Sequence, residues 1–125
     1  MEDNELTSKI IECAIKVHKV LGPGLLESAY KECHYFELIR GGLLVEKEKS
    51  LPLIYEDVKL DCGYRMDLLI EKRVVVEVKS VDALNDIHMA QMLTYLRLNK
   101  TRIGLLMNFN VVRMVDGIKR VVNGY

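Results

Sequence analysis

The spacing of apolar positions along this chain changes from a helical period to a strand period and back. Apolar residues recur at helical spacing over residues 5–21 and again over about 25–39, which predicts two amphipathic helices. The GPG sequence at 22–24 ends the first helix, and the two glycines at 41–42 end the second. The chain therefore opens with a helical pair.

The next stretch alternates apolar and polar positions, which is typical of strands. Strands are predicted at residues 43–49, 51–60, 63–70 and 73–79, as a meander. Pro52 suits a strand start or an edge, because it cannot donate a ladder hydrogen bond. Asp82 can cap a third helix over 83–98. Short closing strands are predicted at residues 103–108, 111–115 and 118–122.

This order of elements predicts an α/β or α+β fold in which helices cover a mixed sheet. The 125 residues are half apolar, which is enough for one hydrophobic core. Internal repeats and linkers are absent from the sequence. We therefore expect residues 1–125 to form a single domain.

Charge and cysteine content narrow the function classes. Eighteen basic residues balance eighteen acidic ones, which argues against a strongly non-specific DNA binder. The cysteines Cys13, Cys33 and Cys62 are odd in number and form no CxxC pair, which favours reduced thiols in the cytoplasm over disulfides or a zinc knuckle. No apolar run is long enough to cross a bilayer, so neither export nor a membrane partner is expected.

The sequence "YRMDLLIEKRVVVEVKS", residues 64–80, puts charged side chains into apolar strands. A short turn around residues 71–73 would form an antiparallel hairpin, with Asp67 opposite residue 76 or 77. Glu77 and Lys79 are two residues apart, so they share a face of their strand. Two carboxylates brought together repel each other, and Mg²⁺ between them makes the arrangement favourable. Lys79 could then act on the attacking water or on developing negative charge.

The D…ExK pattern alone favours a simpler explanation, namely an edge strand with one wet face. The valines before Glu77 shift the balance, because they predict a strand buried on both faces, where unpaired charge is costly. Glu27 is a separate candidate, in the first turn of the second predicted helix. On its own it is explained as an acid that stabilises the N-terminus of that helix.

Gln91 and Tyr95 form a further candidate pair, because residues four apart share one helical face. A glutamine can bond a phosphate or a base edge, and a tyrosine can stack or donate its hydroxyl. Taken alone, the pair is better explained as a surface glutamine and a half-buried tyrosine.

Together these motifs resemble those of a known family. They are Gly24-x-x-Glu27-x-x-Tyr30, Asp67, Glu77-Val78-Lys79 and Gln91-x-x-x-Tyr95, followed by "GLLMNF" and "GIKRVV". In this order they resemble the GxxExxY proteins, a branch of the PD-(D/E)xK nuclease superfamily, over nearly the whole chain. The resemblance implies a restriction-endonuclease-like αβββαβ core, with an extra N-terminal helix and short C-terminal strands.

The resemblance also implies a role for each motif. Asp67 and Glu77 would be metal ligands, the carbonyl of Val78 a further ligand, and Lys79 the catalytic lysine. Glu27 would reach the metal through water. Gln91 and Tyr95 would hold the substrate strand, with Tyr30 of the first motif as another substrate-binding residue. Met66 stands where the superfamily motif has proline, a departure that members commonly tolerate.

We therefore expect a Mg²⁺-dependent nuclease, with Mn²⁺ as an alternative metal and DNA favoured over RNA. Two other functions stay open: an inactive nucleic-acid-binding or assembly module on the same fold, and a metal-dependent hydrolase of another phosphate-containing substrate. A homodimer is expected, because two sites related by a two-fold axis can address two antiparallel strands.

Overall fold

The structure is a computed structural model that describes residues 1–124. The elements follow one another as α1 (Asp3–Leu21), α2 (Glu27–Arg40), β1 (Val45–Ser50), β2 (Leu53–Tyr55), β3 (Val58–Leu60), β4 (Arg65–Ile70), β5 (Val74–Lys79), α3 (Asp86–Asn99), β6 (Ile103–Asn108), the 3-10 helix η1 (Met114–Gly117) and β7 (Ile118–Val122). None of the helices among the described residues has both the length and the apolar character needed to cross a membrane.

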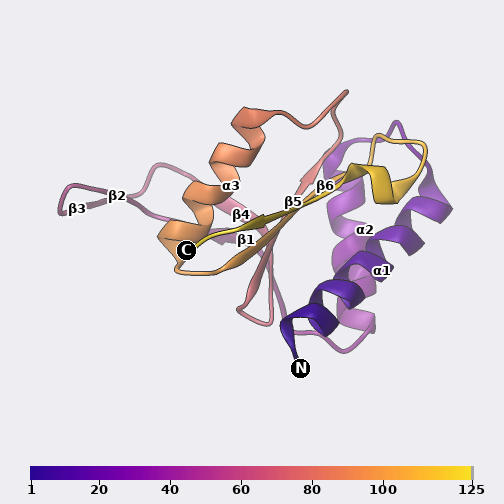
Figure 1. Cartoon of the computed structure of the whole chain (residues 1–125), viewed down its shortest axis with the longest axis horizontal. Helices are drawn as coiled ribbons and strands as arrows, with labels where there is room; N and C mark the ends of the chain where they lie inside the picture. The colour runs from indigo at the N-terminus through magenta and orange to yellow at the C-terminus, as the bar shows by residue number, and fades with distance from the viewer. Residues whose placement is uncertain (125) are drawn as a thin grey trace.

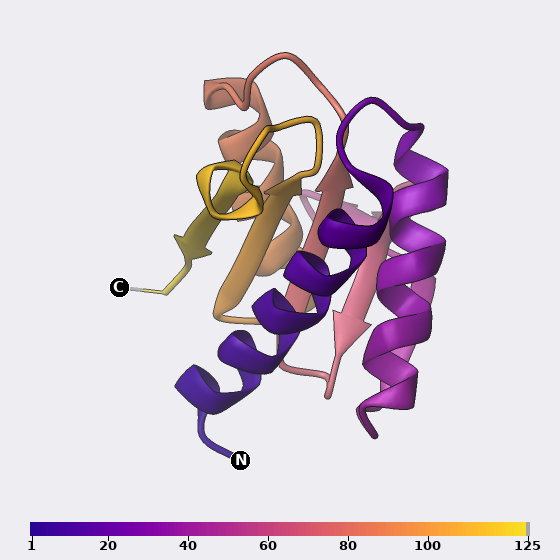
Figure 2. The same cartoon turned by 90° about the vertical axis from the view of Figure 1, so that its right-hand side faces the viewer.

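A five-stranded sheet in the order β1-β4-β5-β6-β7 forms the centre of the molecule. The β5–β6 pair is parallel, and the other neighbours are antiparallel. α3 lies on one face of the sheet, with α1 and α2 on the other (Figure 1). Figure 2 shows α1 and α2 side by side in front of the strands. This arrangement confirms the prediction of a mixed sheet flanked by helices.

β5 is buried from Val74 to Val78 and contributes to both clusters of the hydrophobic core. Val74, Val76 and Val78 pack into the cluster beneath α1 and α2, while Val75 packs into the cluster beneath α3. The alternation places Glu77 on the face that α3 covers. The prediction of a strand buried on both faces is thus confirmed.

The β4–β5 hairpin has the predicted turn. Residues 71–73 form the turn between the paired residues Ile70 and Val74; Glu71 and Lys72 have φ angles of 53° and 56°, and the Arg73 N–H donates to the Ile70 carbonyl at 2.9 Å. The resulting register pairs Leu68 with Val76. One step further along, Asp67 lies opposite Glu77, as expected.

The predicted strand at residues 51–60 is wrong as a member of the meander. A turn at Glu56, whose φ is 54°, folds this segment into the β2–β3 hairpin, which forms its own two-stranded sheet. The hairpin projects from the body of the molecule (Figure 1). β1 therefore pairs directly with β4.

Two smaller predictions are also corrected. Residues 111–115 form bends and the start of η1 instead of a strand, and the carbonyl of Val111 bonds His18 Nε2 at 2.8 Å. Asp82 does not cap the third helix. Asn85 caps it, because its side chain accepts from the His88 N–H while the His88 ring accepts from the Asn85 N–H, which is a capping box.

Gly117 is predicted to be intolerant of a side chain. A Cβ at this position would lie 2.0 Å from the carbonyl oxygen of Asn108, which is backbone at the end of β6. We expect Gly117→Ala to lower the free energy of unfolding by about 1–3 kcal/mol, the usual cost of overpacking. Thermal unfolding measures it. Gly41→Ala is the control, because its nearest contacts would be 3.4 Å. Equal loss in both variants would contradict the steric explanation.

Candidate metal and nucleic-acid site

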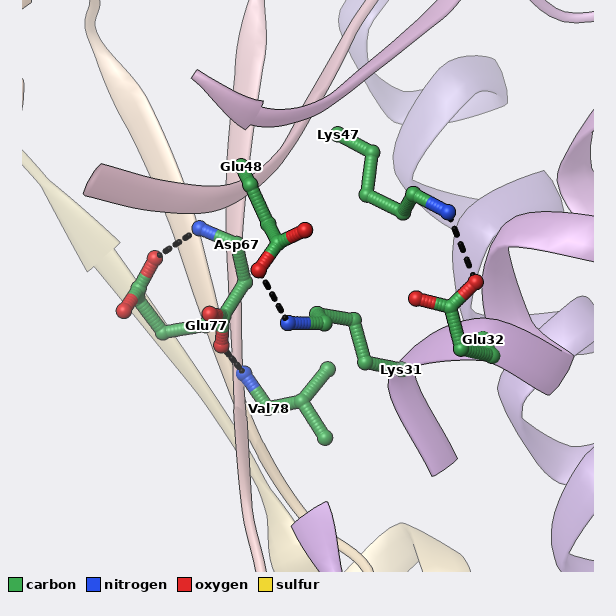
Figure 3. A network of polar contacts seen from close by, with 7 residues as sticks. All are labelled: Lys31, Glu32, Lys47, Glu48, Asp67, Glu77 and Val78. Atoms are coloured by element: carbon green, nitrogen blue, oxygen red, sulfur yellow. Dashed lines mark hydrogen bonds and ion pairs between the residues drawn. The ribbon is translucent and has the colours of Figure 1, made fainter. Parts of the chain in front are cut away.

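The candidate site lies where the hydrogen-bond ladder between β4 and β5 opens. Their pairing ends at Leu68 and Val76, although β5 continues to pair with β6 as far as Lys79. Beyond that point side chains replace the ladder: Glu77 Oε2 accepts from the Asp67 N–H at 2.8 Å, and Asp67 Oδ2 accepts from the Val78 N–H at 2.8 Å (Figure 3). Each carboxylate is thus held by a backbone donor of the opposite strand.

The opening coincides with a local irregularity in β4. Met66 packs into the cluster under α3 and Leu68 into the cluster under α1 and α2, so the usual alternation breaks at Asp67 between them. Across the sheet, the register of β1 places Glu48 opposite Asp67, and Glu48 has a φ of 53°. Both strands therefore deviate from regular geometry beside the carboxylates.

Burial dominates the electrostatics of the pair. Glu77 is 4% exposed, and burial together with the negative charge of Asp67 raises its pKa to about 8. Burial also raises the pKa of Asp67, and the nearby charge of Glu27 adds to the effect. Lys31 and Lys79 act in the opposite direction on both groups. The pair therefore favours a bound proton or cation over two bare negative charges.

Two lysines lie near the pair. Lys79, at the end of β5, is half-buried and makes no ion pair within 4.0 Å in residues 1–124. Lys31 of α2 bonds Glu48 at 3.1 Å (Figure 3). Sequence reasoning predicted Lys79 but missed Lys31. Its signal was its position four residues after Glu27, which places both on one helical face.

Glu27 is the first residue of α2 and lies at the exposed edge of the site. Its Oε2 accepts a long hydrogen bond of 3.4 Å from the Ser80 N–H. The Ser80 hydroxyl donates to the carbonyl of Leu25 at 2.7 Å. Ser80, which the sequence motifs did not single out, thus ties the turn before α2 to the end of β5.

Tyr30 lies in the core, away from any surface that a substrate could touch. Its ring stacks on Phe109 with centroids 4.6 Å apart, and the residue is fully buried. Its hydroxyl donates to the carbonyl of Gly22 and accepts from the Leu25 N–H. The structure therefore gives Tyr30 a different role from the predicted substrate contact: it shapes the turn that positions Glu27.

Gln91 and Tyr95 lie on α3, on the side of the sheet that Glu77 faces, and line one groove. Tyr95 is 6% exposed. Burial, Glu77 and Asp67 together raise the pKa of Tyr95 to about 12, so its phenol stays neutral. A neutral phenol close to two carboxylates can donate a hydrogen bond to an incoming oxygen.

The donor set of the site suits a divalent cation that binds oxygen. In residues 1–124, the second oxygen of each carboxylate has no protein partner, and no Lys or Arg pairs with either group. No group of three or more His, Cys, Asp or Glu side chains in the described part of the chain could hold a metal. Two carboxylates with water completing the shell is the arrangement that Mg²⁺ commonly accepts.

Comparison with known proteins identifies a family. A family model described as the PD-(D/E)XK nuclease superfamily matches residues 4–121, which is nearly the whole chain. Neither the curated proteins nor the solved structures contain a match to this chain.

The buried carboxylates predict an unusual dependence of stability on pH. Glu77 has a pKa of about 8 when folded and an ordinary value of 4.5, so the folded state holds the extra proton between these values. The free energy of unfolding should therefore fall as the pH rises through this range. His34 acts in the opposite direction only below pH 6.5, because burial lowers its pKa from 6.5 to about 4.

The window from pH 6.5 to 8 thus isolates the carboxylates. Without divalent cations, we expect a loss of up to about 2 kcal/mol across it, one proton's contribution. Denaturant unfolding measures the loss. Glu77→Gln, which cannot ionise, should flatten the slope, and an unchanged slope in this variant would contradict the assignment.

Proposed function

Because the chain belongs to the PD-(D/E)XK nuclease superfamily, we propose that it is a Mg²⁺-dependent nuclease that hydrolyses phosphodiester bonds in nucleic acid. The observation that carries the proposal is the opened β4–β5 ladder, where Asp67 and Glu77 are buried together without a cationic partner. The motif Gly24-x-x-Glu27-x-x-Tyr30 further supports assignment to the GxxExxY branch.

We assign Asp67 and Glu77 as direct metal ligands, with the Val78 carbonyl as a further ligand and Glu27 acting through water. The positions of these residues support the assignment. Val78 directly follows Glu77 on β5, and its N–H donates to Asp67. Glu27 lies close enough for its charge to raise the pKa of Asp67. When bound, Mg²⁺, or Mn²⁺ in its place, would polarise a phosphoryl oxygen and lower the pKa of water.

Lys79 is assigned to the transition state. It is half-buried beside the carboxylates and makes no ion pair in the described residues, so its ammonium is available to a phosphate oxygen. A cation placed where negative charge develops accelerates phosphoryl chemistry more than it tightens substrate binding. Lys31, by contrast, already neutralises Glu48. Its bond to Glu48 keeps β1 close to α2 at the site.

Gln91 and Tyr95 are assigned to hold the substrate strand. The amide of Gln91 can donate and accept, and the neutral phenol of Tyr95 can donate to a phosphate oxygen. DNA as the preferred substrate and a homodimeric assembly stay predictions. A panel of single- and double-stranded DNA and RNA tests the first, and light scattering against a monomer mass of 14.4 kDa tests the second.

Metal binding is the first test of this function. Isothermal calorimetry with Mg²⁺ and Mn²⁺ should show binding that is lost or greatly weakened in Asp67→Asn and Glu77→Gln, because each removes a ligand charge while preserving volume. Mg²⁺ should also raise the melting temperature of the unaltered protein more at pH 8 than at pH 6.5, since protons compete for the carboxylates. Identical heats of binding in all three proteins would contradict the assignment of Asp67 and Glu77 as metal ligands.

Cleavage by a Lys79→Ala variant is the second test. We expect kcat to fall by orders of magnitude while KM and metal affinity change little, because the interaction is made in the transition state. Lys9→Ala, an exposed position on α1, serves as the control and should cleave normally.

Each alternative gives a different result. If the protein only binds nucleic acid, neither the unaltered protein nor Lys79→Ala cleaves it. Lys79→Ala then binds nucleic acid more weakly, and the slope of log affinity against log salt concentration falls by about one unit. Equal cleavage by unaltered protein and Lys79→Ala contradicts the assigned role.

A further inference from the structure

A groove of about 300 Å³ lies beside the carboxylate pair, between α3 and the base of the β2–β3 hairpin. Ile87, Gln91 and Tyr95 line it from α3, and Leu53 and Tyr64 line it from the hairpin side. Tyr95 is close enough to Glu77 and Asp67 for their charges to raise its pKa. The groove therefore lies next to the candidate site, with Tyr95 of its lining placed near the carboxylates.

Two exposed side chains give this groove flat and apolar walls. Tyr64 is 42% exposed, and its ring meets that of Tyr95 at 65° with centroids 6.2 Å apart. The backbone of Tyr64 is also fixed, because its carbonyl accepts from the Leu51 N–H at 2.9 Å. Ile87 is 75% exposed. An aromatic side chain held in one orientation and still open to solvent is suited to stacking.

We propose that this groove binds one unpaired nucleobase of the substrate strand, with Tyr64 as the stacking platform. The inference rests on the proposed nuclease function and specifies its substrate as single-stranded or locally unpaired nucleic acid. A base has two flat faces that stack on aromatic side chains and an edge that both donates and accepts hydrogen bonds. The amide of Gln91 supplies the matching donor and acceptor within the groove.

The size of the groove favours an unpaired base. Its volume is at the lower limit for small-molecule sites, so it suits one base and not a stretch of duplex. In a duplex, each base is stacked between its neighbours and paired along its edge, so it must leave the stack before it can enter such a groove. Arg65 follows Tyr64 and is exposed, which places a cation near the backbone of a bound strand.

The test is binding of a dye-labelled oligonucleotide of about 12 nucleotides, measured by fluorescence anisotropy with a chelator present so that no cleavage occurs. The ligands are the single strand, the same strand in a duplex, and single strands with one abasic position moved along the sequence. The unaltered protein should prefer the intact single strand and lose affinity when the abasic position occupies the groove.

Substitutions in the groove test whether Tyr64 is the stacking platform. Tyr64→Ala should weaken single-strand binding by about 5- to 150-fold, the range for loss of one stacked base, and should bind intact and abasic strands alike. Tyr64→Phe keeps the ring and should retain affinity. Ile87→Ala, at an exposed position that the fold does not need, should weaken binding by a smaller factor. Val20→Ala, which is 78% exposed on the opposite face of the molecule, should change nothing.

Three results would overturn the groove assignment. They are no binding of the single strand, single-strand affinity no higher than duplex affinity, and single-strand affinity that is unchanged in both Tyr64→Ala and Ile87→Ala. Single-strand binding that depends on Tyr64, combined with no cleavage in Mg²⁺ or Mn²⁺, would support the groove while refuting the nuclease activity. The two proposals can therefore fail separately.

Discussion

The structure around the candidate site depends on the cost of burying two carboxylates. Asp67 and Glu77 lie where β4 and β5 separate, and each accepts a hydrogen bond from a backbone N–H that the ladder no longer uses. This exchange satisfies two donors that would otherwise be buried without partners. The hydrogen bonds do not neutralise the two negative charges. The raised pKa of Glu77 shows that ionising both carboxyl groups in this buried site remains unfavourable. In the function we propose, a divalent cation would relieve the same cost and supply the site's chemistry.

The surrounding elements hold this opening in place from both sides of the sheet. Under α1 and α2, Tyr30 stacks on Phe109 and fixes the turn from which Glu27 begins α2. On the other side, α3 covers Glu77 with Tyr95. The residues nearest the carboxylates are thus held by helices whose own positions are set by the hydrophobic core. This rigidity is what a site that relies on positioned charges requires.

The sequence predicted the parts of the site that follow from short-range geometry. The hairpin register could be predicted to within one residue because a short turn leaves little freedom, and the valine run identified a doubly buried strand. The burial of Tyr30 could not be predicted, because it depends on Phe109, which is distant in sequence. The β2–β3 hairpin was missed for another reason: its alternating pattern is the same whether the segment joins the central sheet or folds on itself.

The two hairpins differ in how they should tolerate insertions and deletions. A residue added to the turn at Glu71 and Lys72 would shift β4 against β5 by one position, turning Asp67 to the other face and separating it from Glu77. The turn at Glu56 joins strands that pair only with each other and project from the body, so a longer connection there leaves the central register intact. Length variation among related chains should therefore collect at the tip of the β2–β3 hairpin and be absent from the β4–β5 turn.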